Sequence, residues 1–137
     1  MKKHESQMTK SEIHCLIGRL KKIGYQTRLS NHTLQRLEER NMKPQDVFNV
    51  FKKYKIMEFE NDLSGSRVLL RSRDPVYKGK DDVCIVVNLI NGDIVSAYTD
   101  VHKDNSYVKE DLSNYNSSMD IKSFLRFYPP SIRRKKK

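Results

Sequence analysis

At 137 residues, with 36% hydrophobic side chains, the chain has the length of one compact domain with a modest core. Its formal net charge is +10, and the basic run 133–137 supplies five of those charges, so the body is itself basic and favours polyanions, nucleic acid first. No apolar run approaches the roughly 18 residues of a membrane span, and two cysteines cannot make a disulfide framework. We expect a cytoplasmic protein without membrane contact.

The first third of the sequence has the period of helices. Thr9 and Glu12 form a capping-box pattern, and apolar residues then recur every three or four positions up to Gly24. A second helix is predicted to start at Ser30 or Asn31 and to end at Asn41, a residue that tolerates a left-handed conformation. Pro44 suits the first position of a third helix, over 45–54.

The middle of the sequence changes to the two-residue period of strands. Four strands are predicted, over residues 56–60, 67–73, 83–90 and 93–99. Asn91-Gly92 predicts a type I′ hairpin between the last two strands. Residues 100–117 are polar and predict an irregular segment, followed by a short helix over 119–127 that stops before Pro129.

These elements predict an α+β fold, with three N-terminal helices packed on a four-stranded antiparallel sheet. We expect one domain over residues 1–128 and an irregular basic tail over 129–137. With the helices on one face, the other face of the sheet is open to a ligand.

Two sets of cationic side chains are candidates for binding an anion. On the second helix, His32, Arg36 and Arg40 lie one turn apart on one side. The alternative is a solvated face on which the arginines pair with Glu38 and Glu39.

The second set lies on a predicted strand. Because side chains alternate along a strand, Arg67, Arg71 and Arg73 share one face, which predicts a wet or anion-holding surface. The last strand ends in Tyr98 and Thr99, with His102 just beyond. Tyrosine and threonine are common in strands, so neither residue alone indicates a site. The indication is that all three polar side chains lie together at one strand end.

The segments HTLQRLEERNMKPQDV and CIVVNLINGDIVSAYTD resemble a family of short bacterial and phage proteins. That family has a His-x3-Arg-x3-Arg helix and a closing strand of Ile-Val-Thr-x-Tyr type. It looks related to the barnase, EndoU, colicin and RelE (BECR) group of metal-independent ribonucleases, many of them toxins. The resemblance covers residues 30–100, and Ser96 stands where such sequences more often have threonine.

The resemblance implies a RelE-like or barnase-like fold and a hydrolase of toxin type that cleaves tRNA or mRNA, with no metal and no cofactor. Its implied partners are RNA and an acidic antitoxin or immunity protein. The catalytic candidates are a proton-transferring histidine, a phosphate-binding arginine and a proton-donating phenol: His32, His102, Arg71 and Tyr98. The candidate RNA-binding side chains are Arg36, Arg40, Arg67, Arg73, Thr99 and Lys103.

Two other functions remain open from the sequence. The chain could be a noncatalytic nucleic-acid- or protein-binding factor of phage or mobile-element origin, because its positive charge is plain whereas the acid–base pair is inferred. A purely structural partner, docking its basic face on an acidic protein, is the third alternative.

Overall fold

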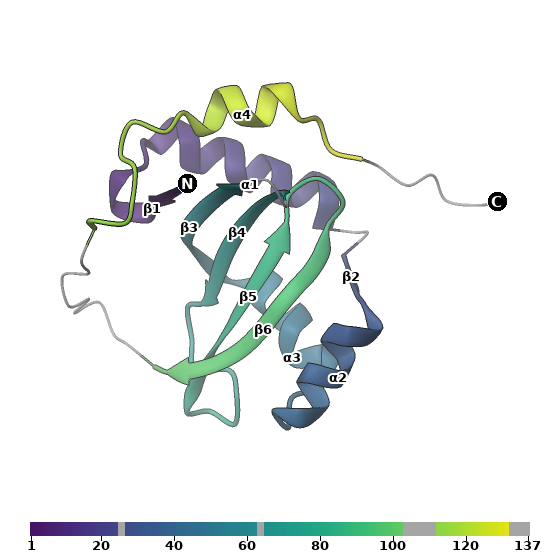
Figure 1. The fold of residues 1–137 in the computed structure, drawn as a ribbon. Coiled ribbons are helices and arrows are strands. Elements are labelled where there is room, and N and C mark those ends of the chain that lie inside the picture. The colour runs from purple at the N-terminus through teal and green to yellow at the C-terminus, as the bar shows by residue number, and fades with distance from the viewer. Residues whose placement is uncertain (25–26, 63–64, 103–111, 132–137) are drawn as a thin grey trace.

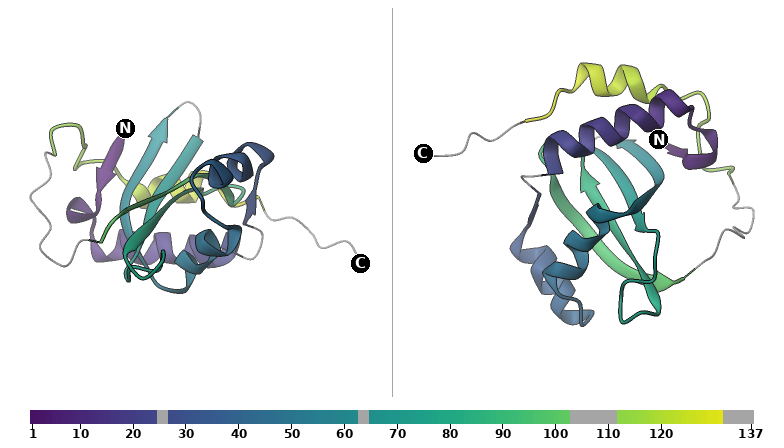
Figure 2. Two further views of the ribbon diagram at one scale, coloured as in Figure 1. Left: turned by 90° about the horizontal axis from the view of Figure 1, so that it is seen from below. Right: turned by 180° about the vertical axis from the view of Figure 1, so that it is seen from behind.

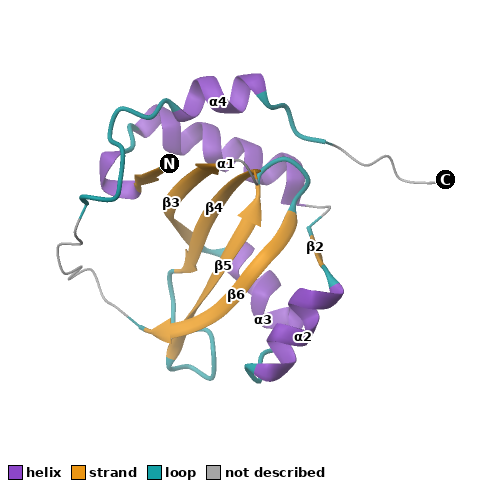
Figure 3. Cartoon of the chain, viewed as in Figure 1, coloured by secondary structure: helices purple, strands orange, loops and turns teal. Residues whose placement is uncertain are grey.

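The computed structural model describes residues 1–24, 27–62, 65–102 and 112–131, which form one mixed sheet with helices packed on it (Figures 1 and 3). The strands are β1 (Lys2–His4), β2 (Arg28–Leu29), β3 (Tyr54–Asp62), β4 (Gly65–Ser72), β5 (Asp81–Asn88) and β6 (Asp93–Val101). The helices are α1 (Lys10–Gly24), α2 (Asn31–Glu39), α3 (Pro44–Asn49) and α4 (Ile121–Phe127), with 3₁₀ turns at Glu5–Gln7 and Val50–Lys52.

The sheet has six strands in the order β1-β3-β4-β5-β6-β2. The four predicted strands form its antiparallel centre, β1 adds to β3 antiparallel, and β2 adds to β6 parallel. The α+β class is therefore right, but three N-terminal helices on a four-stranded antiparallel sheet is wrong. The added strands span three and two residues, too few to display a two-residue period.

Local signals place most helix ends correctly. Thr9 and Glu12 exchange the two hydrogen bonds of a capping box at the start of α1, and the Ser30 hydroxyl accepts from the Thr33 amide at the start of α2. Asn41 takes the predicted left-handed conformation, with φ of 56°. The third helix is shorter than predicted, because the α-helix ends at Asn49 and continues only as a 3₁₀ turn.

The hairpin between β5 and β6 is confirmed, but its predicted turn type is wrong. A type I′ turn needs positive φ at both central residues, whereas only Gly92 has one, at 80°. The loop spans four residues, Leu89–Gly92, because the Asn88 side chain accepts from the amides of Ile90 and Asn91 and so widens the turn.

The core lies on one face of the sheet, beneath α1, α3 and α4. Its largest fully buried side chain, Phe59 of β3, meets the Phe124 ring of α4 edge-on at 5.4 Å. Two buried cations tie the C-terminal segment to α1: Lys3 pairs with Glu12 of α1 at 2.8 Å and donates to the Met119 carbonyl, and Arg19 of α1 donates to the carbonyls of Leu125 and Tyr128. The helix predicted over 119–127 is confirmed, although α4 begins at Ile121, and its apolar side chains complete the core.

The opposite face of β3–β6 carries no helix in the part of the chain that the structure describes (Figures 1 and 2). The registers shift in β3 at Met57 and in β6 at Val95, which marks a β-bulge in each outer strand of this group. Bulges increase the local twist and bend their strands, which favours a hollowed open face. No helix among the described residues is long and apolar enough to cross a membrane.

Candidate active site

A chain of charged side chains lies on the open face at the end of β6. Asp82 accepts from Arg71 Nε at 2.7 Å through Oδ2, and its other oxygen, Oδ1, lies 2.6 Å from Nδ1 of His102. Arg71 also donates to Asp100 Oδ2 at 3.0 Å and to the Val101 carbonyl at 2.6 Å. We call Arg71, Asp82, Asp100 and His102 the strand-end cluster.

Burial differs sharply within the strand-end cluster. The side chains of Asp82 and Arg71 are 2% and 7% exposed, whereas that of His102 is 28% exposed. Burial by itself lowers the pKa of the Arg71 guanidinium, but its hydrogen bonds with Asp82 and Asp100 outweigh burial and raise that pKa, so Arg71 stays charged. In this cluster the partly exposed imidazole of His102 is therefore held by the buried ion pair of Arg71 and Asp82.

The register brings Tyr98 next to this cluster. Cys84 of β5 pairs with Arg71 of β4 on one side and with Tyr98 of β6 on the other. Burial, and then the charge of the Cys84 thiolate and the hydrogen bond with Cys84, raise the pKa of Tyr98 to about 12. The phenol therefore keeps its proton at neutral pH and can donate it in a hydrogen bond.

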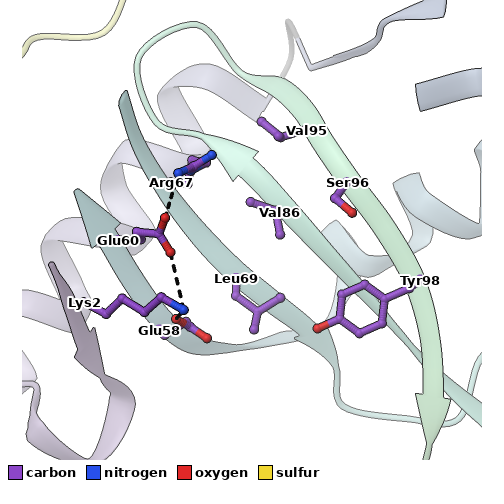
Figure 4. A pocket seen from close by; sticks show the side chains of 9 residues that line it. All are labelled: Lys2, Glu58, Glu60, Arg67, Leu69, Val86, Val95, Ser96 and Tyr98. Carbon is purple, nitrogen blue, oxygen red and sulfur yellow. Dashed lines mark hydrogen bonds and ion pairs between the residues drawn. The ribbon is translucent and has the colours of Figure 1, made fainter. Parts of the chain in front are cut away.

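A hollow of about 300 Å³ extends over the open face from Tyr98 toward β1 (Figure 4). It is lined by Lys2, Glu58, Glu60, Arg67, Leu69, Val86, Val95, Ser96 and Tyr98. Leu69 and Val86 form an apolar floor, and the Tyr98 phenol points across it toward Leu69 (Figure 4). Arg67 donates to Glu60 and Asp62, at 2.6 Å each, so it is neutralised rather than unpaired.

The helix residues predicted for the site do not join the strand-end cluster. His32 and Arg36 are exposed on α2. The guanidinium of Arg40 donates to the carbonyl of Ala97, and the Thr33 hydroxyl donates to that of Ile94 at 3.0 Å. α2 therefore covers the outer edge of β6, an edge that would otherwise present unpaired carbonyls.

The remaining predicted residues are dispersed. Arg73 donates to the Tyr54 carbonyl at 2.9 Å, away from the strand-end cluster. Thr99 pairs with Val83 in register, on the face opposite to Tyr98. Lys103 lies outside the described residues, as does the segment 132–137 of the basic tail.

Sequence reasoning missed the two carboxylates that organise the cluster, Asp82 and Asp100. Each lies beside an apolar run of the sequence, at a position where an acidic residue usually marks only the end of a strand. Their partnership is visible only through the register that sets Asp82 opposite Asp100. The available signal was an acidic residue on each arm of a hairpin, aligned with an arginine on the adjacent strand.

Comparisons with protein-family models, curated proteins and solved structures found no significant match to this chain. The resemblance to the ribonuclease group therefore stays a prediction.

Proposed function

We propose that the chain is an endoribonuclease that cleaves RNA by general acid–base catalysis at the strand-end cluster. The observation that carries this proposal is the 2.6 Å contact between His102 Nδ1 and Asp82, itself anchored on Arg71. A buried carboxylate that holds one ring nitrogen fixes the tautomer and orientation of the imidazole, as a proton-transferring histidine requires.

In the proposed reaction, His102 Nε2 takes the proton of a ribose 2′-hydroxyl. The 2′-oxygen then bonds to the adjacent phosphorus, and the bond from phosphorus to the 5′-oxygen breaks. Tyr98, protonated at neutral pH, donates toward the departing 5′-oxygen. The products are a 2′,3′-cyclic phosphate and a 5′-hydroxyl end.

The role of Arg71 in this proposal differs from the phosphate-binding role predicted from the sequence. Each of its three nitrogens already has a protein partner, and its side chain is 7% exposed. Arg71 therefore acts as a positioning residue that holds Asp82, rather than as the phosphate clamp. Between the two candidate histidines, the geometry favours His102 over His32.

The finer parts of the proposal come from the resemblance and the net charge of +10. They are a toxin-type enzyme of the cytoplasm, tRNA or mRNA as substrate, no metal, and an acidic antitoxin or immunity protein as partner.

The test is cleavage of total RNA in the presence of EDTA. We expect wild-type protein to cut RNA and His102→Gln to lose about 100-fold or more in rate, the contribution typical of a general base. His32→Gln is the matched control and should cut at the wild-type rate. Cleavage unaffected by His102→Gln, or no cleavage by wild type at any concentration, would refute the proposal.

A second candidate function, noncatalytic binding, is favoured by one observation. Arg67 is neutralised by Glu60 and Asp62, and Arg71 by Asp82 and Asp100, so neither arginine can stabilise the charge of a cleavage transition state, whereas the net charge of +10 still favours nucleic acid. Salt-dependent RNA binding without turnover, unchanged by His102→Gln, would support this function.

A further inference from the structure

A second hollow lies on the helix-covered face of the sheet, between α1 and the segment that leads from α3 into β3 (Figure 2). Its volume is about 350 Å³, at the lower end of the range for ligand pockets. Tyr54 lines this hollow and also a smaller one of about 110 Å³. Because Tyr54 pairs with Ser72, and Ser72 and Arg71 point to opposite faces, the site lies on the other side of the sheet from the strand-end cluster.

The wall of the larger hollow is mainly apolar. Phe48, Phe51 and Tyr54 follow one another at three-residue steps, and their rings line it together with Leu20 of α1. All three rings are only partly buried. Gly24, at the end of α1, adds no side chain, and nothing lies within 4 Å of the place that its Cβ would take. Partly exposed aromatic rings around an open space suit an apolar ligand.

The charged side chains at the two hollows are mostly cations. They are Lys21 at the larger hollow, and Lys55, Arg73 and Glu5 at the smaller one. Neither Lys21 nor Arg73 forms an ion pair within the part of the chain that the structure describes. On the open face, by contrast, Arg67 is paired with two carboxylates. The charge at these hollows therefore favours an anion.

Two polar side-chain groups of the larger hollow are available to that anion. Lys21 Nζ is one, and the Tyr54 hydroxyl, which has no hydrogen-bond partner among the described residues, is the other. Burial raises the pKa of Tyr54, so the phenol is a protonated donor at neutral pH. The Thr27 hydroxyl already donates to the Gly24 carbonyl at 3.0 Å. One cation and one neutral donor match a single carboxylate, whereas phosphate groups are bound by several donors.

We infer that this hollow binds a small amphiphilic carboxylate of the fatty-acid type, with its alkyl chain against the rings of Phe48 and Phe51. Its carboxylate meets Lys21 and the Tyr54 hydroxyl. The inference goes beyond the proposed function and does not depend on it, because the two sites lie on opposite faces of the sheet.

The experiment measures binding of butanoate, hexanoate and octanoate to the full chain by calorimetry, with backbone amide shifts to locate the site. We expect affinity to rise about threefold for each methylene added, the gain from burying one methylene. Octanoate should bind about tenfold more tightly than octylammonium, which has the same chain and the opposite charge. Lys21→Gln should remove that preference. Lys22→Gln, a change of the adjacent exposed lysine outside the lining, should keep it.

Two glycines of α1 provide a second matched pair of variants. Neither Gly18 nor Gly24 has an atom within 4 Å of the place that a Cβ would take, so both accept a larger side chain. Only Gly24 lines the hollow. Gly24→Leu, which fills the hollow, should abolish octanoate binding, and Gly18→Leu should leave it unchanged. Circular dichroism establishes that both variants are folded.

Three results would overturn the inference: affinity that does not depend on chain length, equal affinity for octanoate and octylammonium, or octanoate binding that survives Gly24→Leu. The absence of octanoate binding at millimolar concentration would do so as well. If the chain sediments as a dimer that Gly24→Leu dissociates, the occupant is a second copy of the chain and the inference is wrong.

Discussion

Two regions of this molecule combine a histidine with arginines, and they differ in what lies beneath those side chains. On α2, His32 and Arg36 stand on an exposed helix face, one turn apart. At the end of β6, His102 and Arg71 share the two oxygens of one buried carboxylate, Asp82. The sequence shows that His32 and Arg36 are spaced by one helical turn. A fixed orientation of the imidazole, however, requires a buried hydrogen-bond partner such as the Asp82 carboxylate, which His102 has. The comparison moves the candidate site from the helix to the strand end.

The largest expected effect is on stability, from removal of the central carboxylate of the strand-end cluster. Asp82→Ala leaves Arg71 buried with one carboxylate fewer, and breaking a buried ion pair in this way costs about 3 kcal/mol of unfolding free energy. Urea denaturation measures the loss.

Asp100→Ala is the matched control for that variant. The Asp100 side chain is 41% exposed, so its pair with Arg71 is worth about 1 kcal/mol or less. Equal losses for the two variants would show that Asp82 does not anchor the cluster.

A second prediction concerns alkaline pH. Burial raises the pKa of Tyr98 from 10.0 to about 12, so between those values the unfolded chain has released a proton that the folded chain keeps. Stability from this group is complete below pH 10 and falls as pH rises toward 12. Urea denaturation at several pH values should show a shallower decline for Tyr98→Phe than for wild type.

Tyr128→Phe, at a half-exposed position on the end of α4, serves as the comparison for the alkaline series. It should decline in parallel with wild type. A Tyr98→Phe series that also runs parallel to wild type would contradict the assignment of Tyr98 as a buried, proton-retaining phenol.

Local signals explain how far the fold could be predicted. Caps and turn residues such as Thr9, Ser30 and Pro44 act on their immediate neighbours, so the helix starts follow from the sequence. β1 and β2 exist only because β3 and β6 offer edges to pair with. Their three and two residues are too few to show the alternation of a strand, so the sequence does not predict a six-stranded sheet.

The candidate site depends on register in the same way. A two-residue turn at Asn91-Gly92 would pair Cys84 with Thr99, whereas the four-residue loop and the bulge at Val95 pair it with Tyr98. A slip of one residue moves every side chain to the other face. Alternation places Tyr98 and Thr99 on opposite faces of the sheet, and the loop together with the bulge decides which of them shares the face of Arg71.

The smallest expected effect separates two arginines of the same helix. Arg40 donates to the Ala97 carbonyl on the edge of β6, whereas Arg36 is exposed one turn earlier. Arg40→Ala should cost about 1 kcal/mol of unfolding free energy, the net worth of one hydrogen bond, and Arg36→Ala should stay within about 0.5 kcal/mol of wild type. Urea denaturation of both variants measures the difference.

The RNA-binding affinity of the same two variants is a second measurement. A helix that only covers a sheet edge does not contact the substrate. If Arg36→Ala weakened RNA binding by a larger factor than His102→Gln slowed cleavage, α2 would therefore be the functional region.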